Sequence, residues 1–278
     1  MTIKSILVHL CGTDAGKSVV ATGRALAQAH DAKLVGIFAG VPYDMPAYVM
    51  AQLPQEVIMA HQEHVEESAH ATAEAFEAAC LADGLAHESR EGDWREPVED
   101  VISMHARYSD LVIIAQPDPE SGSRNREIAD HIVLRAATPV IVVPRKPALD
   151  TIGKRVIVGW DGSAPAARAV QDALPLLEKS DFVKVLCIDP KPGIAGLGDL
   201  PGADLCQYLA SHGVNAEAAH TKSGGVAVGD ILLNNAADMG ADLIVSGSYG
   251  HSRIGELIMG GVTDTLMNSM TVPTLMSH

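Results

Sequence analysis

The sequence holds two copies of one pattern, and this internal repeat constrains the fold more than any other feature. SILVHLCGTD from Ser5 aligns with RVIVGWDGSA from Arg155, and SDLVIIAQ from Ser109 aligns with ADLIVSGS from Ala241. Towards the end of each copy, ATPVIVVP and MTVPTLMS align in the same way. Because the matches keep the same order, the chain is predicted to contain two units of one fold, each roughly 140 residues long.

Within each copy, short apolar runs alternate with stretches of helical length. The first copy predicts strands at 3–9, 33–39, 86–91, 111–115 and 139–143, with helices at 18–30, 55–83, 97–107 and 124–136. The second predicts strands at 155–159, 183–188, 214–220, 243–245 and 272–276, with helices at 165–177, just before 212, at 226–239 and at 262–269.

This alternation predicts the α/β fold class: two repeated five-stranded parallel-sheet domains with helices on both faces, Rossmann-like in their winding. The expected boundaries are a first domain at 1–146, a linker at 147–153 and a second domain at 154–278.

The composition limits the functions open to this chain. Of its 278 residues, 47% are hydrophobic but only 4% aromatic, which suits parallel sheets packed with Ala, Val, Leu and Ile. A formal net charge of −15 argues against nucleic acid and against an anionic membrane surface as partners. The four cysteines form no CxxC pair, and no apolar run approaches the ~18 residues of a membrane span. We therefore expect a cytoplasmic protein with reduced thiols and no signal peptide.

The segment from Ala241 to Thr263 carries the candidate binding site. The apolar run Leu243–Ile244–Val245 is followed by Ser246 and then by Gly247–Ser248–Tyr249–Gly250, and after nine more residues comes the pair Gly260–Gly261. Glycines at the end of a buried strand let backbone N–H groups approach an anion. Val262 follows as a predicted helix start, and a helix N-terminus favours a phosphate. Short glycine motifs also match by chance, so the spacing alone leaves a plain connector equally open.

The second half of the chain resembles a universal stress protein domain, and the whole chain resembles a tandem, two-domain member of that family. The resemblance rests on VIVGWDGS at the first strand, Gly247-x2-Gly250-x9-Gly260 at the fourth, and TVPTLMSH at the end. It covers essentially all of residues 154–278, whereas the first half matches in layout only. The resemblance implies a fold like that of the adenine-nucleotide alpha-hydrolases, and some members of the family bind ATP without a strong catalytic apparatus.

The family pattern, carried over residue by residue, implies a site for ATP or another adenine nucleotide, with or without Mg²⁺. A carboxylate after the first strand would contact the adenosine, backbone after the second strand would line the adenine pocket, and the glycines would approach the phosphates. The implied ligand-binding residues are Asp161, Gly162, Ile188, Ser246, Gly247, Ser248, Gly250, His251, Arg253, Gly260, Gly261, Val262 and Thr263. Nucleotide-binding members usually carry Ser or Thr where this chain has Gly261, so one hydroxyl donor is missing, worth on the order of 1 kcal/mol or somewhat more for a charged acceptor. His251 and Arg253 are equally well explained as solvated surface residues.

The first half departs from this pattern at each site position. Cys11 stands where the second half has Asp161, residues 115–118 replace the GSYG turn, and Arg126–Glu127 replace the late glycines. Acidic groups near a phosphate loop repel the ligand. We therefore expect the first domain to be a structural partner that binds no nucleotide.

Two loops imitate other nucleotide sites. The segment 11–18 follows a strand and opens a helix like a Walker A loop, but Cys11 stands where that loop needs glycine. The segment 223–225 resembles the phosphate loop of ATP pyrophosphatases, yet it follows the third strand and lacks the Asp and Ser of that motif. Both are therefore interpreted as loops at helix starts.

Two features of the first half leave their roles open. His61, His64 and Glu67 lie along one helix face, where interleaved glutamates favour a solvated surface over a zinc site, and no structural metal is expected. The insert at 41–54, rich in Pro, Tyr and Met, suits a lid or, in our preferred interpretation, a contact surface.

The sequence thus predicts a stress-response protein whose second domain binds an adenine nucleotide and which acts as a regulator or sensor. No catalytic arrangement is evident from spacing, so at most weak ATP hydrolysis is expected; a slow ATPase and a scaffold without nucleotide remain alternatives. The last strands of the two halves, 139–143 and 272–276, are expected to pair in an intramolecular pseudo-dimer, and the whole chain is expected to form a homodimer.

Overall fold

The protein is described by a computed structural model, in which residues 2–39, 52–93, 96–118, 120, 123–145, 151–190, 200–248 and 261–278 are defined. The chain divides into two compact units. One is Ile3–Thr138; the other is Pro139–His278 together with Met1–Thr2. Each is an α/β unit and is described by itself.

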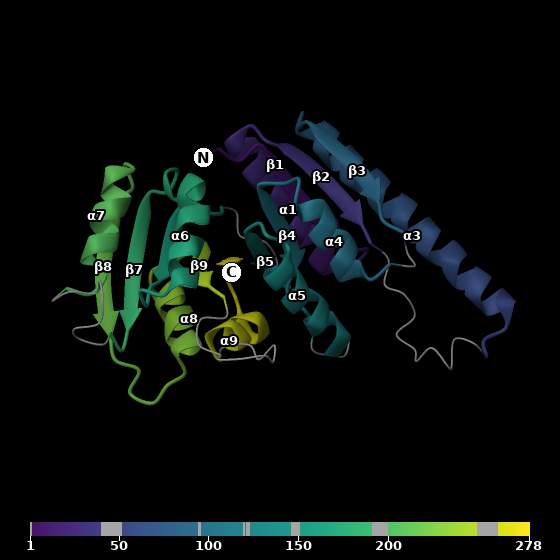
Figure 1. The fold of residues 1–278 in the computed structure, drawn as a ribbon. Coiled ribbons are helices and arrows are strands. Elements are labelled where there is room, and N and C mark those ends of the chain that lie inside the picture. Colours follow the sequence, from purple (N-terminus) through teal and green to yellow (C-terminus); the bar gives the residue numbers. More distant parts are fainter. Residues whose placement is uncertain are drawn as a thin grey trace. The chain divides into compact units, whose positions relative to one another are not determined.

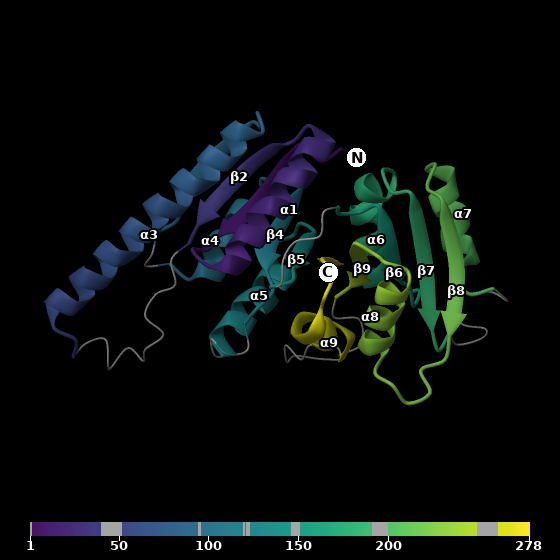
Figure 2. The same ribbon diagram turned by 180° about the vertical axis from the view of Figure 1, so that it is seen from behind.

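The first unit has a parallel sheet in the order β3-β2-β1-β4. Figures 1 and 2 show α1 and α3 covering one face of this sheet, with α4 and α5 on the other. The elements, in chain order, are β1 (Ser5–Leu10), α1 (Asp14–His30), β2 (Lys33–Phe38), α3 (Gln55–Ala82), β3 (His87–Glu91), α4 (Val98–Ala106), β4 (Leu111–Ala115) and α5 (Ser123–Arg135).

The second unit has a sheet in the order β5-β10-β9-β6-β7-β8, parallel except at β5. Helices α6 and α7 lie on one face, and α8 and α9 lie on the other (Figures 1 and 2). The elements are β5 (Val140–Val143), β6 (Arg155–Gly159), α6 (Ala164–Leu177), β7 (Phe182–Ile188), α7 (Ala203–Ser211), β8 (Ala216–Thr221), α8 (Val228–Asp238), β9 (Leu243–Gly247), α9 (Gly261–Ser269) and β10 (Thr274–Ser277). The predicted α/β fold class with a mostly parallel sheet is confirmed.

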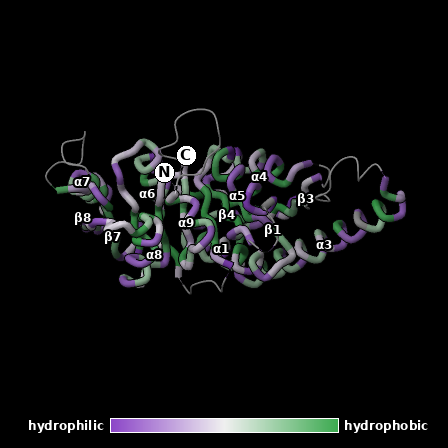
Figure 3. Tube along the Cα trace, turned by 90° about the horizontal axis from the view of Figure 1, so that it is seen from below, coloured by the Kyte–Doolittle hydropathy of each residue, from purple (hydrophilic) through white to green (hydrophobic). Residues whose placement is uncertain are grey.

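The central strands consist of branched aliphatic residues because helices cover both of their faces. In β4 and β9 the first four residues are all buried, and β5 is buried along its whole length. In Figure 3 the helix α3 instead alternates between hydrophilic and hydrophobic segments, as expected for a helix with one face on a sheet. The alternation of strand and helix read from the sequence therefore corresponds to real elements.

The repeat is also visible in the hydrogen bonds that fix the first strand of each copy. The carboxylate of Asp110 accepts hydrogen bonds from the backbone N–H groups of Lys4 and Ser5, at 2.8 and 3.0 Å. In the second copy, Asp242 accepts from the N–H groups of Lys154 and Arg155, at 3.1 and 2.9 Å. The aligned SDL and ADL segments thus place an equivalent carboxylate under the start of each first strand.

Strand β5 belongs to the second unit, although the repeat assigns it to the first copy of the sequence. It pairs antiparallel with β10, with Ile141 opposite Leu275 in the register. The predicted pairing of the last strands is confirmed by this register. The domain boundary at 146 stays a prediction, while the contacts divide the chain at Thr138.

Some predictions concern residues outside the described part of the chain. These include most of the insert, at 41–51, and much of the predicted linker, at 147–150. Over the described ranges, no helix combines the length and the apolar character needed to cross a membrane.

Candidate ligand-binding site

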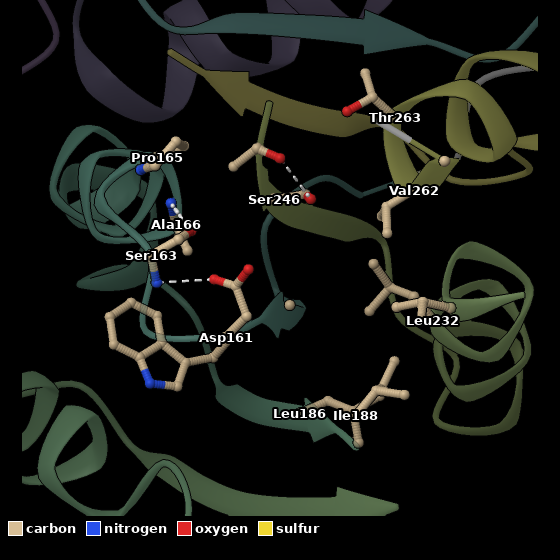
Figure 4. A pocket seen from close by; sticks show the side chains of 15 residues that line it. Asp161, Ser163, Pro165, Ala166, Leu186, Ile188, Leu232, Ser246, Val262 and Thr263 are labelled. Atoms are coloured by element: carbon tan, nitrogen blue, oxygen red, sulfur yellow. Dashed lines mark hydrogen bonds between the residues drawn. The ribbon is translucent and has the colours of Figure 1, made fainter. Parts of the chain in front are cut away.

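A cavity of about 170 Å³ opens at the carboxyl ends of β6, β7 and β9 in the second unit. Figure 4 shows its polar side at the start of α6, its apolar side between β7 and α8, and the start of α9 opposite. Its lining consists of Gly159, Trp160, Asp161, Ser163, Pro165, Ala166, Leu186, Ile188, Val228, Leu232, Ser246, Gly247, Gly261, Val262 and Thr263. Open α/β sheets bind ligands at this edge, because the loops that leave the strands diverge there.

The polar side is built around the turn that follows β6. Gly162 has a φ of 75°, which suits glycine, and this turn directs the chain from the strand into α6. Asp161 Oδ1 accepts a hydrogen bond from the Ser163 N–H at 2.9 Å. Ser163 Oγ in turn caps α6 by accepting from the Ala166 N–H at 3.3 Å. The turn and the cap therefore hold the carboxylate in place while the side chain stays accessible.

The apolar side is formed by Leu186 and Ile188 of β7 and by Val228 and Leu232 of α8. These side chains offer a non-polar surface of the kind that holds a flat heterocycle. Cys187, between Leu186 and Ile188 in β7, is buried and does not line the cavity. Burial, followed by the neighbouring Cys206 and Asp161, raises the pKa of its thiol to about 11. Cys187 is therefore a packing residue and not a reactive thiol.

The third side is the first turn of α9. The helix begins at Gly261, within one residue of the predicted start, and Val262 and Thr263 line the cavity beside it. The first turn of a helix has backbone N–H groups without intrahelical partners, and the helix dipole adds positive potential there. A Cβ added at Gly261 would have open space around it. This residue is therefore not required by packing.

Positions 159 and 247, both at the cavity, are glycine for different physical reasons. A Cβ added at Gly247 would lie 2.5 Å from the Ala166 backbone nitrogen and 2.6 Å from the Pro165 carbonyl carbon. Position 247 must therefore be glycine because β9 lies directly against the start of α6. This reason differs from the predicted one, which was a close approach of the backbone to a phosphate. A Cβ added at Gly159 would lie 3.4 Å from the Leu232 side chain and 3.8 Å from the Val245 carbonyl oxygen, which are ordinary contacts. Gly159 keeps the cavity open.

The structure brings together seven of the thirteen residues predicted for the site: Asp161, Ile188, Ser246, Gly247, Gly261, Val262 and Thr263. Gly162 shapes the turn without lining the cavity. Ser248 is fully buried, and its hydroxyl donates to the Ser277 carbonyl oxygen at 2.8 Å, so it belongs to the sheet. The remaining four, Gly250, His251, Arg253 and Gly260, lie outside the described residues.

Sequence reasoning predicted Ile188 but missed the part of the apolar wall that α8 contributes. Val228 and Leu232 are four residues apart on one face of α8, which is an ordinary core pattern and gives no sign of a ligand. Gly159 and Trp160 lie within the VIVGWDGS motif that marked the site, and the switch from a strand run to Gly-Trp-Asp could have identified them.

The first unit has a histidine at the position that Gly159 holds in the second. His9 lies at the end of β1, and its Nε2 is buried with no hydrogen-bond partner among the described residues. Burial lowers the pKa of His9 to about 4, although a hydrogen bond with the backbone of Ala39 acts in the opposite direction. An uncharged imidazole therefore fills space at the strand end where the second unit keeps a glycine.

The loop that resembles a Walker A motif offers no phosphate cradle. The N–H groups of Thr13, Gly16 and Lys17 already donate within the loop, to the Cys11 carbonyl, the Thr13 hydroxyl and the Thr13 carbonyl. A Cβ at Gly16 would lie 2.0 Å from the Cys11 carbonyl oxygen, so the turn is closed tightly. Among the side chains that the structure defines, no group of three or more His, Cys, Asp and Glu residues is placed to hold a metal ion.

A parallel α/β unit with a cavity at the carboxyl ends of its central strands defines the class of doubly wound α/β domains. Residues 153–278 match the family model described as the universal stress protein family. This part of the chain therefore belongs to the universal stress protein family. No curated protein sequence gives a significant match.

Solved structures extend the likeness in fold to the whole chain. A universal stress protein from Archaeoglobus fulgidus DSM 4304 has a TM-score of 0.74 at 14% identity, covering 99% of this chain and 96% of that one. A putative universal stress protein from Pseudomonas aeruginosa UCBPP-PA14 has a TM-score of 0.59 at 13% identity, covering 99% and 93%. A functionally unknown protein from Pseudomonas aeruginosa PAO1 has a TM-score of 0.60 at 12% identity, covering 99% and 92%. At such identities the likeness concerns the fold alone.

Proposed function

We propose that the second unit binds an adenine nucleotide and that the protein acts as a stress-response regulator or sensor. The observation that carries this proposal is one cavity with three chemically different sides: a carboxylate, an apolar wall and a helix N-terminus. An adenine nucleotide has three matching parts. Its ribose hydroxyls donate hydrogen bonds, its base is flat and largely apolar on its faces, and its phosphates are anionic.

The three parts are assigned to the three sides by their chemistry. The ribose hydroxyls donate to the carboxylate of Asp161, and the base packs between Ile188 and Leu232. The phosphates lie toward the first turn of α9, where Gly261 and Thr263 begin the helix. With glycine at the first of these positions, binding relies on backbone groups, so the affinity is expected to be moderate. Any Mg²⁺ would arrive with the phosphates, since the described lining offers a single carboxylate.

Binding without turnover is the favoured role. Hydrolysis needs a group that activates water near the phosphates. Asp161 already accepts a hydrogen bond from the Ser163 N–H and lies on the ribose side of the assignment. The first unit, with His9 at its strand end, is proposed to bind no nucleotide and to support the second unit structurally.

The test begins with denaturing freshly purified full-length protein and chromatographing the small molecules that are released. ATP, ADP and AMP are then titrated into the protein by calorimetry, alongside the variants Asp161→Asn and Asp204→Asn. Asp204 is exposed in the first turn of α7 and does not line the cavity, so it serves as the matched control. One nucleotide per chain, weakened only by Asp161→Asn, supports the proposal. The absence of binding heat at millimolar nucleotide would refute it and favour a scaffold, whereas phosphate release above the variant control would indicate a slow ATPase.

A further inference from the structure

A second and larger cavity lies in the first unit, between α1 and α3, on the sheet face that both helices cover (Figure 2). Its volume is about 460 Å³. Its lining consists of Leu10, Cys11, Gly12, Thr13, Gly16, Lys17, Val20, Ala21, Arg24, Ser68, Ala71, Thr72, Ala75, Phe76 and Ala79. It shares no residue with the cavity of the second unit.

Small side chains keep this space open. The α3 residues that face α1 are alanine, serine and threonine at helical spacings of three and four, apart from Phe76. The floor below is well packed: Leu10 and Phe76 are buried, and a Cβ at Gly36 would lie 2.8 and 2.9 Å from their side chains. Because the residues between the cavity and the sheet are tightly packed, the cavity is a space between helices α1 and α3 and not a packing defect of the core.

The lining is mainly apolar and contains two cations but no carboxylate, in a chain whose net charge is −15. Arg24 is held by Asp83, with a guanidinium-to-carboxylate distance of 2.6 Å and both side chains about 30% exposed. Lys17 pairs with Asp14 at 2.8 Å, but these side chains are 82% and 93% exposed. An ion pair as exposed as this one contributes little, so a bound anion can compete for Lys17.

Polar groups gather at the end of the cavity nearest Lys17. A Cβ at Gly12 would lie 3.3 Å from Ser68 Oγ and 3.5 Å from Thr72 Oγ1, so the loop after β1 brings its backbone against these hydroxyls. Neither hydroxyl has a hydrogen-bond partner within the defined part of the structure. Helix α1 also begins here, with Thr13 as its N-cap, and its dipole adds positive potential. This end can therefore receive an anionic, hydrogen-bond-accepting group.

We propose that the cavity binds a single-chain amphiphile with an anionic head, of the class of free fatty acids. The carboxylate accepts hydrogen bonds from Lys17, Ser68 and Thr72, and the alkyl chain lies over Phe76 toward Ala79. From Ser68 to Ala79 the helix advances about 16 Å at 1.5 Å per residue, which suits a chain of medium length. A nucleotide fits less well, because its phosphates need several donors and only one cation here is weakly held.

The binding test uses the full-length protein and dodecanoate below its micelle concentration, followed by calorimetry. Saturable binding of one dodecanoate per chain is expected, with no detectable binding of butyrate and weaker binding of dodecyltrimethylammonium. Heat that appears only near the micelle concentration, or equal affinity for the cationic and anionic amphiphiles, would overturn the proposal.

Matched variants locate the site. Ala75 is exposed but lines the cavity, so Ala75→Leu adds three carbons at its wall and should weaken dodecanoate binding by at least tenfold, since each buried methylene is worth about 0.8 kcal/mol. Ala78→Leu, an exposed position on the same helix outside the lining, should leave binding unchanged. Lys17→Gln should weaken binding about two- to fivefold, the effect of one exposed ion pair, while Lys4→Gln should not. Equal effects of the two leucine variants would contradict this location. Asp161→Asn should retain dodecanoate binding, which separates this proposal from that of the nucleotide site.

Discussion

Because glycine at position 159 leaves room in the cavity and glycine at position 247 allows close packing, substitutions at the two positions should act differently. The first should affect nucleotide binding and the second should affect folding stability. In Gly159→Val, the new side chain points at Leu232, whose nearest atom lies 3.4 Å from the added Cβ, an ordinary contact. Three carbons then enter a cavity of about 170 Å³. Valine suits a strand better than glycine, by up to about 1 kcal/mol, which offsets part of the cost of fitting its γ-methyl groups beside the flexible Leu232 side chain, so stability should change by less than in Gly247→Ala. Nucleotide binding should be lost.

In Gly247→Ala, one added carbon meets backbone and not a side chain. Contacts of 2.5 and 2.6 Å with Ala166 and Pro165 are about 1 Å shorter than an unstrained carbon contact, so β9 and α6 must separate. Overpacking of this kind typically costs about 1–3 kcal/mol. The variant should therefore unfold at a lower urea concentration, with an unchanged denaturant dependence.

Urea unfolding followed by circular dichroism, together with ATP calorimetry on the folded variants, tests both expectations. If Gly159→Val binds ATP as tightly as the wild type, the ligand does not occupy this cavity. If Gly247→Ala unfolds at the wild-type urea concentration, the close contact between β9 and α6 is not a constraint on the fold. Gly261→Ala is the control for stability alone, because an added Cβ there meets no described atom within 4 Å, and Asp204→Asn, outside the cavity, is the control for ATP binding.

Three further predictions follow from particular contacts. Gly261→Ser should tighten ATP binding by about tenfold or more in calorimetry, since a hydroxyl to a charged acceptor is worth about 1.5–3 kcal/mol; an unchanged affinity would place the phosphates elsewhere. Asp242→Ala should destabilise the protein by about 2–4 kcal/mol in urea unfolding, because it leaves the N–H groups of Lys154 and Arg155 without their acceptor; a loss below 1 kcal/mol would contradict this. Burial lowers the pKa of His9 from 6.5 to about 4, so below pH 6.5 the unfolded chain takes up a proton that the folded one does not. The free energy of unfolding should keep its full value above about pH 6.5 and fall by up to about 3 kcal/mol toward pH 4. His9→Leu should remove this part of the pH dependence.

Much of the fold could be predicted because it depends on local patterns. The aligned segments identified the repeat, and apolar runs alternating with helical stretches identified the elements of both units, with the start of α9 found within one residue. Asp161 was predicted differently, from the resemblance of VIVGWDGS to a universal stress protein motif, and it lies in the turn between the end of β6 at Gly159 and the start of α6.

The part of the apolar wall that α8 contributes could not be predicted in this way. Val228 and Leu232 become cavity residues only when α8 packs beside the end of β7. The sequence pattern of a helix face that meets a ligand is the same as that of a face that meets a core.

The sequence by itself determined the repeat, the α/β class and the polar motif of the second unit, because strand and helix periodicity are properties of neighbouring residues. The tertiary structure decided which unit β5 belongs to, why Gly247 must be glycine, and which positions open or fill a cavity. Those outcomes depend on distances between residues far apart in the chain. Gly159 and His9 occupy equivalent positions in the repeat, but only their packed surroundings show that one leaves space and the other fills it.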